Sequence, residues 1–248
     1  MKGINSAFFV GAVAATPELR YTAGGTAILE LTLAGKSEVQ GKDEVKHLSF
    51  YQRTKAFGKF AEALAEGLSQ GDALTVNGRM DFRSWEGEKS KRSAVELVIE
   101  TINTLDAEGF TFDKDARSQP RLNEGVNEVT LAGNLTKDAE LRYTPSGDAV
   151  AHFSIAVNER VGKEDRVGFY DVEVWRELAE RYGSLSKGAG IIATGRIVND
   201  SFEGRDGKVF TTTLEATRLY VVAGRSEGRQ APPPVKEAAI QPKADLPF

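Results

Sequence analysis

The chain repeats itself over a distance of more than one hundred residues. Residues 19–22 read Leu-Arg-Tyr-Thr and recur as residues 141–144, an offset of 122 positions. Further along, Gly78-Arg79 recurs as Gly195-Arg196, an offset of 117. The offset falls while the motifs persist, so the loops differ in length and the structural elements do not. A repeat of this length indicates two whole domains rather than a stack of small repeats.

Each repeat predicts five strands and one short helix. A helix over about 59–68 is indicated by Phe60, Leu64 and Leu68, which are spaced four apart, with Gly71 as a stop signal. The strands of the first repeat are expected over about 4–14, 26–35, 47–57, 73–83 and 93–105. A helix between the third and fourth strands is the order of an oligonucleotide-binding (OB) fold, a small Greek-key barrel. The second repeat gives the same order across about 126–223, so we expect an all-β chain with two tandem OB-folds, each a five-stranded Greek-key barrel with one short helix.

The domain boundaries follow from changes in pattern. We expect the first OB-fold over residues 1–106 and the second over residues 125–224. Residues 107–124 lack a clear hydrophobic period and contain a glycine and a proline, which is typical of a linker. Residues 225–248 contain a run of three prolines and few apolar residues, so we expect a disordered tail.

The apolar run at the N-terminus has two interpretations. Residues 7–15 follow Met1-Lys2 and have the small-residue ending of a secretory signal. The matching segment of the second repeat lies inside the chain, where no signal peptide can act, so both segments are better interpreted as first strands. No run approaches the roughly 18 apolar residues of a membrane span, and a chain without cysteine suits a reducing compartment. We therefore expect a cytoplasmic protein with no membrane partner.

Composition argues against an enzyme and is neutral on nucleic acid. The chain has no cysteine and two histidines, its acidic residues show no metal-ligand spacing, and no glycine-rich phosphate loop is present. We expect no catalytic residue, no metal and no cofactor. The net charge is -4, so any affinity for nucleic acid must come from a local arrangement of Lys and Arg.

One face of the first repeat combines aromatic and basic side chains. Alternate residues of a strand share a face, which groups outward residues on the third and fourth predicted strands. Bases stack on aromatic rings while cations contact phosphates, so this mixture suits a single strand with free bases. The alternative is that the aromatic residues pack against a partner barrel or cover the core. The candidate binding residues of this repeat are Tyr51, Arg53, Lys55, Phe57, Arg79, Arg83 and Trp85.

The second repeat keeps the aromatic positions and reverses charge. Asp171 and Glu173 stand where the first repeat has Arg53 and Lys55. Carboxylates near a phosphate backbone oppose binding, so we predict that the first repeat supplies more of the affinity and salt dependence. The candidate binding residues of the second repeat are Phe169, Trp175, Arg196 and Phe202.

Taken together, residues 3–5, the motif at 19–22, the aromatic and basic run at 51–62, Gly78-Arg79 and Trp85 resemble the bacterial single-stranded-DNA-binding protein family. The resemblance covers nearly the whole chain. Two copies in one chain resemble the two-OB-fold members of the Deinococcus and Thermus group, which pair as homodimers with four OB-folds. The resemblance implies a nucleoid-associated protein that binds single-stranded DNA without sequence preference, and it places the aromatic candidates at the family's base-stacking positions.

The C-terminal residues Asp245, Leu246, Pro247 and Phe248 resemble the acidic tip of the family, which recruits replication, recombination and repair proteins. Residues 225–248 hold four basic residues against three acidic ones, so a long-range acidic field is absent here. The terminal carboxylate and Asp245 can still meet a basic pocket while Phe248 fills an apolar one. The alternative is an unstructured end with no partner.

A rival function for two OB-folds is a structural or translational protein that binds folded RNA or only other proteins, because the fold hosts many functions. Such a protein would lack aromatic residues on the barrel face, whereas six aromatic residues occupy paired positions here. Stacking does not distinguish DNA from RNA, so the expectation of DNA rests on the resemblance.

Overall fold

The computed structural model describes residues 3–40, 44–86, 91–204 and 207–222. The first repeat folds into a closed barrel of five strands, which pair in the order β1-β5-β6-β4-β3 and close through β1 and β3. Helix α1 (Gly58–Gly67) lies between β4 and β5, as the sequence predicted. The strands of this barrel are β1 (Ile4–Val13), β3 (Ala27–Gln40), β4 (Val45–Phe57), β5 (Ala73–Glu86) and β6 (Lys91–Thr104).

The second repeat builds the same barrel with the same order, β9-β13-β14-β12-β11, closed through β9 and β11. Helix α2 (Glu177–Tyr182) takes the place of α1. The strands are β9 (Val126–Leu135), β11 (Ala149–Val161), β12 (Glu164–Trp175), β13 (Gly190–Gly204) and β14 (Gly207–Val222). The prediction of an all-β chain with two tandem OB-folds, each with one helix, is therefore confirmed.

The repeated motif at residues 19–22 lies mostly in a short strand, and so does its copy at residues 141–144. Strand β2 (Glu18–Tyr21) pairs with β3, and β10 (Glu140–Tyr143) pairs with β11. All four residues of β2 are exposed, so this four-residue strand buries no face in the core of the barrel. The turn itself follows β2, with Gly25 at φ +79°.

The repeated glycines of the Gly-Arg motif mark a bulge in each barrel. The register between β5 and β6 shifts at Asn77/Gly78, and that between β13 and β14 shifts at Thr194/Gly195. A Cβ atom on Gly78 would lie 2.0 Å from the carbonyl oxygen of Val98. The backbones approach so closely that only glycine fits, which is why the motif recurs.

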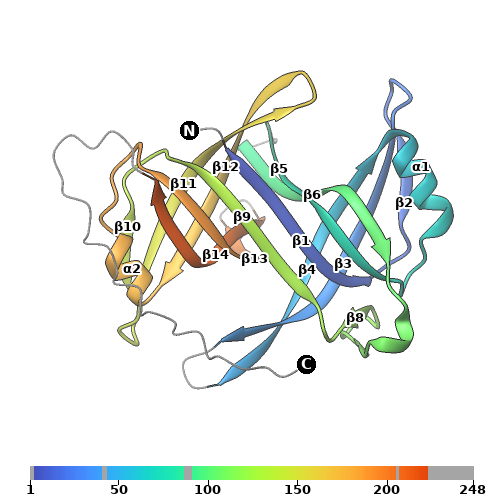
Figure 1. Cartoon of the computed structure of the whole chain (residues 1–248), viewed down its shortest axis with the longest axis horizontal. Helices are drawn as coiled ribbons and strands as arrows, with labels where there is room; N and C mark the ends of the chain where they lie inside the picture. Colours follow the sequence, from blue (N-terminus) through green and yellow to red (C-terminus); the bar gives the residue numbers. More distant parts are fainter. Residues whose placement is uncertain (1–2, 41–43, 87–90, 205–206, 223–248) are drawn as a thin grey trace, which may run out of the picture.

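The two barrels share one continuous sheet, because β1 pairs antiparallel with β9 (Figure 1). Ile4 pairs with Ala132, and Val10 pairs with Val126. By the offset of 122, Val126 is the equivalent of Ile4 and Ala132 is the equivalent of Val10, so the contact is reciprocal. This is the pattern of a two-fold symmetric interface, built here within one chain.

The core extends through both barrels. One cluster of buried residues includes Phe9 and Leu29 of the first barrel together with Leu131 and Phe153 of the second. These four side chains are among the largest fully buried ones. The barrels are thus joined by backbone pairing and by a shared apolar core, and not by the connecting segment alone.

The segment predicted to be a linker contains secondary structure. It forms a 3-10 turn (Ala107–Gly109) followed by a hairpin of β7 (Phe112–Lys114) and β8 (Pro120–Leu122), which we call the interdomain hairpin. Leu122 is fully buried, and β8 pairs with β3 at Gly35. Strands of three residues are too short to show a hydrophobic period, so the sequence did not reveal them. The predicted tail, residues 225–248, lies outside the described residues.

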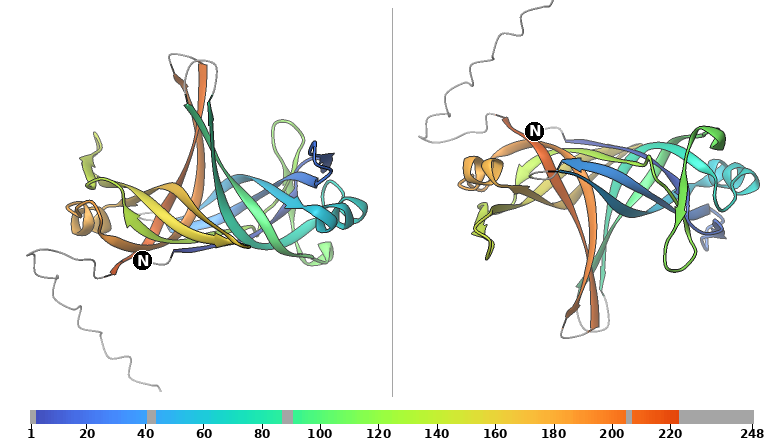
Figure 2. Two further views of the ribbon diagram at one scale, coloured as in Figure 1. Left: turned by 90° about the horizontal axis from the view of Figure 1, so that it is seen from above. Right: turned by 90° about the horizontal axis from the view of Figure 1, so that it is seen from below.

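Two long hairpins project from the same side of the molecule (Figure 2). One is formed by β5 and β6 of the first barrel, and the other by β13 and β14 of the second. The interdomain hairpin points to this side as well. Within the described ranges, no helix is long and apolar enough to cross a membrane.

Candidate nucleic-acid interface

The outward face of β4 carries the predicted aromatic and basic residues of the first barrel. Tyr51, Arg53 and Phe57 lie on this face, with Arg53 and Phe57 exposed and Tyr51 half-buried. The intervening residues Gln52 and Thr54 are buried, as strand alternation requires. Arg53 forms no ion pair with any residue that the structure describes. Its guanidinium is therefore available to a phosphate.

Lys55 lies on the same strand face, but its charge is already paired. Its ammonium lies 2.7 Å from a carboxylate oxygen of Glu96 and 3.0 Å from one of Glu30. Lys55 is 7% exposed and Glu96 is 6% exposed. Arg83, on the neighbouring β5, contacts the same Glu96 carboxylate. Lys55 thus neutralises two carboxylates and Arg83 shares Glu96, so Arg53 is the candidate cation of this face without an ion pair in the described residues.

The β5–β6 hairpin presents an aromatic ring near its end. Trp85 is exposed there, two residues beyond Arg83. Arg79, at the base of the same strand, is mostly buried and lies within 4.0 Å of carboxylate oxygens of Asp81, Glu100 and Glu159. Arg79 therefore stabilises the junction of the barrels, because Glu159 belongs to the second barrel.

The second barrel repeats the aromatic face on β12. Phe169 and Trp175 are exposed, and Asp171 lies between them on the same face. Phe202 lies in β13, and its side chain is outside the described part of the chain. Arg196 forms a bidentate ion pair with Glu215, with N–O distances of 2.9 and 3.2 Å, so its charge is paired.

The charge reversal on β12 is partly compensated by a neighbouring strand. In the first barrel Glu30 pairs across β3 and β4 with Lys55, and in the second barrel His152 pairs across β11 and β12 with Glu173. The acidic residue is on β3 in the first barrel and on β12 in the second, and the basic residue is on β4 in the first and on β11 in the second. Both barrels therefore keep an acid–base pair at this position. The two faces then differ in charge at one pair of equivalent positions, which hold Arg53 in the first barrel and Asp171 in the second.

His152 lies between two carboxylates. Its Nε2 atom is 3.4 Å from Asp171 and its Nδ1 atom is 3.8 Å from Glu173. Hydrogen bonding to Asp171 and then to Glu173 raises the pKa of His152 to about 9. The same contact with His152 lowers the pKa of Asp171. The imidazole is therefore charged at neutral pH and offsets part of the acidity of this face.

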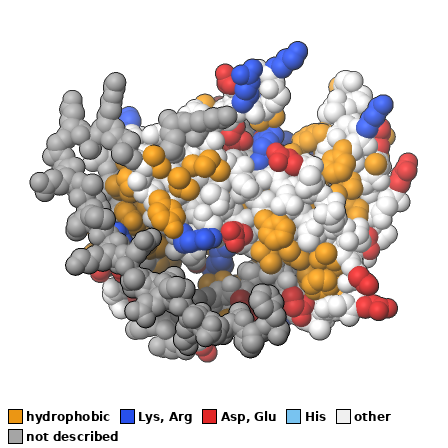
Figure 3. All heavy atoms as spheres, in the orientation of Figure 1, with side chains coloured by type: hydrophobic (Ala, Val, Ile, Leu, Met, Phe, Trp, Pro, Cys, Tyr) orange, Lys and Arg blue, Asp and Glu red, His pale blue; other side chains and the backbone are white. Residues whose placement is uncertain are grey.

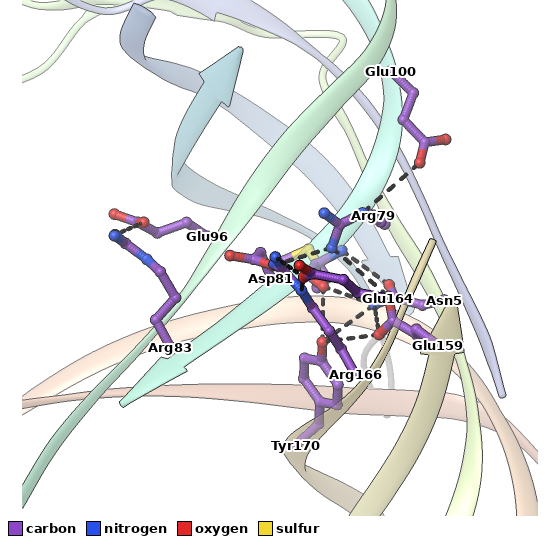
Figure 4. Close-up of polar contacts among 11 residues, drawn as sticks. Asn5, Arg79, Asp81, Arg83, Glu96, Glu100, Glu159, Glu164, Arg166 and Tyr170 are labelled. Carbon is purple, nitrogen blue, oxygen red and sulfur yellow. Dashed lines mark hydrogen bonds and ion pairs between the residues drawn. The ribbon is translucent and has the colours of Figure 1, made fainter. Parts of the chain in front are cut away.

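A polar network joins the two barrels behind these faces (Figure 4). Asn5 donates to the carbonyl oxygen of Met80 at 2.7 Å and to the carboxylate of Glu159 at 2.6 Å. The hydroxyl of Tyr170 donates to the same carbonyl oxygen at 2.7 Å. Burial is the main cause that raises the pKa of Tyr170, so this hydroxyl stays protonated.

Sequence reasoning missed two contacts of the predicted aromatic residues. The ring of Phe169 lies edge to face against Phe82 of the first barrel, with centroids 5.7 Å apart. The hydroxyl of Tyr51 donates to a carboxylate oxygen of Asp115 in the interdomain hairpin at 2.8 Å. No pattern in residues 107–124 indicates this contact, because it depends on where the hairpin docks.

No metal site is formed by the residues in the described ranges, since no three His, Asp or Glu side chains are grouped there. The structure has two closed five-stranded barrels, and aromatic rings are exposed on β4 of the first and on β12 of the second. Fold and face together define an OB-fold protein with two binding units in one chain.

Comparisons with known proteins agree with this class. The model of the "Single-strand binding protein family" matches residues 4–105 and again residues 126–222. A single-stranded DNA-binding protein of Thermus thermophilus is 45% identical over 224 residues, which covers 88% of this chain and 83% of that protein. One from Deinococcus radiodurans is 41% identical over 231 residues, covering 90% and 76%. The chain belongs to the single-strand binding protein family.

Solved structures give the same result. The crystal structure of the wild-type single-stranded DNA binding protein from Thermus aquaticus superposes with a TM-score of 0.73 at 36% identity. The match covers 93% of this chain and 98% of that one. The expected resemblance to the two-OB-fold members of the Deinococcus and Thermus group is thus confirmed.

Proposed function

We propose that this protein binds single-stranded DNA without sequence preference and protects unpaired strands, acting as a binding protein and not as an enzyme. The observation that carries the proposal is the exposed aromatic rings on equivalent strands of two barrels, with Arg53 among them. A duplex hides its base faces, so rings of this kind favour a single strand. Each stacked base contributes about 1–3 kcal/mol.

The two tryptophans make a direct test possible, because each barrel holds one on its proposed binding surface. Trp85 lies on the β5–β6 hairpin and Trp175 at the end of β12. Fluorescence of the full chain should be quenched by oligo-dT and not by a duplex of equal length, and more salt should weaken the binding. The variants Trp85→Phe and Trp175→Phe then report on one barrel each. No quenching with oligo-dT, or equal affinity for the duplex, would overturn the proposal.

We propose further that the first barrel supplies more of the affinity and of the salt dependence. Arg53 is available to a phosphate, whereas Asp171 occupies its place in the second barrel. The matched variants Phe57→Ala and Trp175→Ala each remove one ring from equivalent positions. A labelled oligo-dT should lose more affinity with Phe57→Ala, and equal losses would contradict the ranking.

We also propose self-association into a homodimer with four barrels. Apolar residues pair across the shared sheet, Ile4 with Ala132, Ala132 with Ile192 and Ile192 with Tyr220, and the two at the ends of this row are exposed. Ile4 is 45% exposed and Tyr220 is 62% exposed. Figure 3 shows hydrophobic side chains in separate patches on the face viewed, with charged side chains between them. Light scattering should give twice the chain mass, and Tyr220→Glu should give the single chain.

The C-terminal residues Asp245, Leu246, Pro247 and Phe248 lie outside the described residues, and their role remains a proposal. We propose that they recruit replication, recombination and repair proteins to coated DNA at the nucleoid by C-terminal capture. A chain that lacks these four residues should bind oligo-dT as the full chain does and should lose binding to such proteins. Unchanged protein binding would contradict this role.

A further inference from the structure

The interdomain hairpin is fixed to the first barrel. Leu122 is fully buried in a small apolar cluster with Val10, Ala12 and Ala73. Strand β8 pairs with β3 at Gly35, and a Cβ atom on Gly35 would lie 3.3 Å from the backbone of Gly125. The hairpin therefore holds one position on the barrel, and does not act as a free connector.

From this position the hairpin reaches the outward face of β3 and β4. The Arg121 guanidinium donates to the hydroxyl of Ser49 at 3.0 Å, and the Lys36 ammonium pairs with Asp113. Two residues further along β4, the hydroxyl of Tyr51 donates to Asp115 at 2.8 Å. Ser49, Tyr51 and Arg53 share one face of β4. The tip of the hairpin thus lies beside the proposed binding residues.

The carboxylates of the hairpin are already satisfied. Asp115 accepts from the backbone N–H groups of Gln119 at 2.9 Å and Arg117 at 2.8 Å, and these bonds, with that from Tyr51, lower its pKa. Asp113 pairs with Arg121 at 2.7 Å, which lowers its pKa. Asp113 is therefore neutralised by cations, whereas Asp115 keeps its negative charge and is held in place by its hydrogen bonds.

Two cations of the hairpin have no such partner. The side chains of Lys114 and Arg117 are exposed and form no ion pair with a residue in the described ranges. They flank Asp115, which contacts Tyr51. Between residues 112 and 122 the chain has three basic and two acidic residues, so the hairpin carries a net charge of +1. Lys114 and Arg117 thus add exposed positive charge to the segment that contacts Tyr51.

The second barrel lacks this arrangement in its described part. Phe169, the equivalent of Tyr51, is 47% exposed and rests against Phe82. Tyr51 is half-buried, and burial followed by the bond to Asp115 raises its pKa. One ring is therefore held by an apolar contact and the other by a hydrogen bond to the hairpin.

We propose that the interdomain hairpin is part of the single-stranded-DNA surface of the first barrel. Lys114 and Arg117 bind backbone phosphates, and Asp115 is a positioning residue that fixes the Tyr51 ring for stacking. This inference rests on the proposed function. It adds two phosphate contacts on a segment that separates the two repeats.

The phosphate contacts are tested by the salt dependence of binding to oligo-dT. Each of Lys114→Ala and Arg117→Ala should reduce the slope of log K against log salt by about 0.7 and the affinity at 0.1 M salt by about 5-fold. Lys187→Ala is the matched control, because Lys187 is also exposed in a turn and lies after α2 in the second barrel. It should leave the slope unchanged.

The positioning role is tested by Tyr51→Phe, which keeps the ring and removes the hydroxyl. Binding should weaken by about 5-fold, because the ring must now be ordered on binding, while the salt slope stays that of the wild type. A Tyr51→Phe variant that binds oligo-dT as tightly as the wild type would overturn the positioning role.

The outcomes separate the two proposals. If the wild type binds oligo-dT and both cation variants keep the wild-type slope, the hairpin proposal is wrong and the proposed function stands. Equal loss in Lys187→Ala would also overturn the hairpin proposal, since any cation would then have the same effect. If the wild type does not bind oligo-dT, both proposals fail.

Discussion

Lys55 and Arg53 lie two residues apart on one strand face. The structure predicts that removal of Lys55 lowers stability, whereas removal of Arg53 weakens the binding of DNA. Lys55→Met removes an ammonium that lies between Glu30 and Glu96, and Arg53→Met removes a guanidinium without an ion pair in the described residues. Methionine keeps most of the side-chain length in both variants. Each variant removes one positive charge. Comparing the two therefore separates a cation that stabilises the fold from a candidate phosphate contact.

The size of the Lys55 effect follows from burial. Removing one partner of a buried ion pair costs about 3–5 kcal/mol, because the other charge stays buried. Glu96 is 6% exposed, and it keeps one partner, since Arg83 also contacts it. We therefore expect a loss of about 2–3 kcal/mol, which corresponds to a fall in Tm of about 5–10 °C for a chain of this size. Arg53→Met should change stability by less than about 0.5 kcal/mol.

Thermal unfolding and oligo-dT titration at several salt concentrations measure both effects. Arg53→Met should reduce the salt slope by about 0.7, as one lost phosphate contact. Lys55→Met should keep the wild-type slope at temperatures where it is folded. A stable Lys55→Met with a reduced slope would refute the reasoning, because Lys55 would then contact phosphate and not hold Glu96.

Three further predictions concern the fold. Gly78→Ala should cost about 1–3 kcal/mol by denaturant unfolding, because its Cβ would lie 2.0 Å from a carbonyl oxygen, whereas Gly67→Ala, with nothing within 4 Å, should be neutral. His152→Gln should have a lower Tm than the wild type at pH 6.5 and below. The difference should vanish as pH rises through about 9, since a raised pKa stabilises the fold only while the group is protonated. Tyr170→Phe should lose about 1 kcal/mol by removing the hydrogen bond to the Met80 carbonyl, and an unchanged midpoint would contradict that contribution.

Local patterns were enough to predict the barrels. The four-residue spacing of Phe60, Leu64 and Leu68 predicted a helix over 59–68, and the structure has it over Gly58–Gly67. Alternation along β4 placed Tyr51 and Arg53 on one outward face. Such signals survive in the sequence because helix and strand periods are set by the backbone of each element alone.

Contacts between segments far apart in the sequence were not predictable in this way. Lys55 has the same alternation as Arg53, yet Glu96, forty-one positions away, pairs with one and not with the other. The segment 107–124 has no period, and its burial of Leu122 depends on the surface of β1. The sequence of β4 does not specify Glu96 as the partner of Lys55, and the sequence of residues 107–124 does not specify where Leu122 is buried.

The sequence by itself determined that the chain holds two copies of one barrel, because a duplication leaves equivalent glycines, aromatic residues and turns in register. It also determined that the aromatic positions persist while charge changes. Only the tertiary structure decided that β1 and β9 join the barrels into one sheet. It also decided that His152 and Glu173 form an ion pair in the second barrel, and that the interdomain hairpin reaches Tyr51. The physical reason is that strand periods and turns are local, whereas ion pairing and docking depend on which strands the folded chain places side by side.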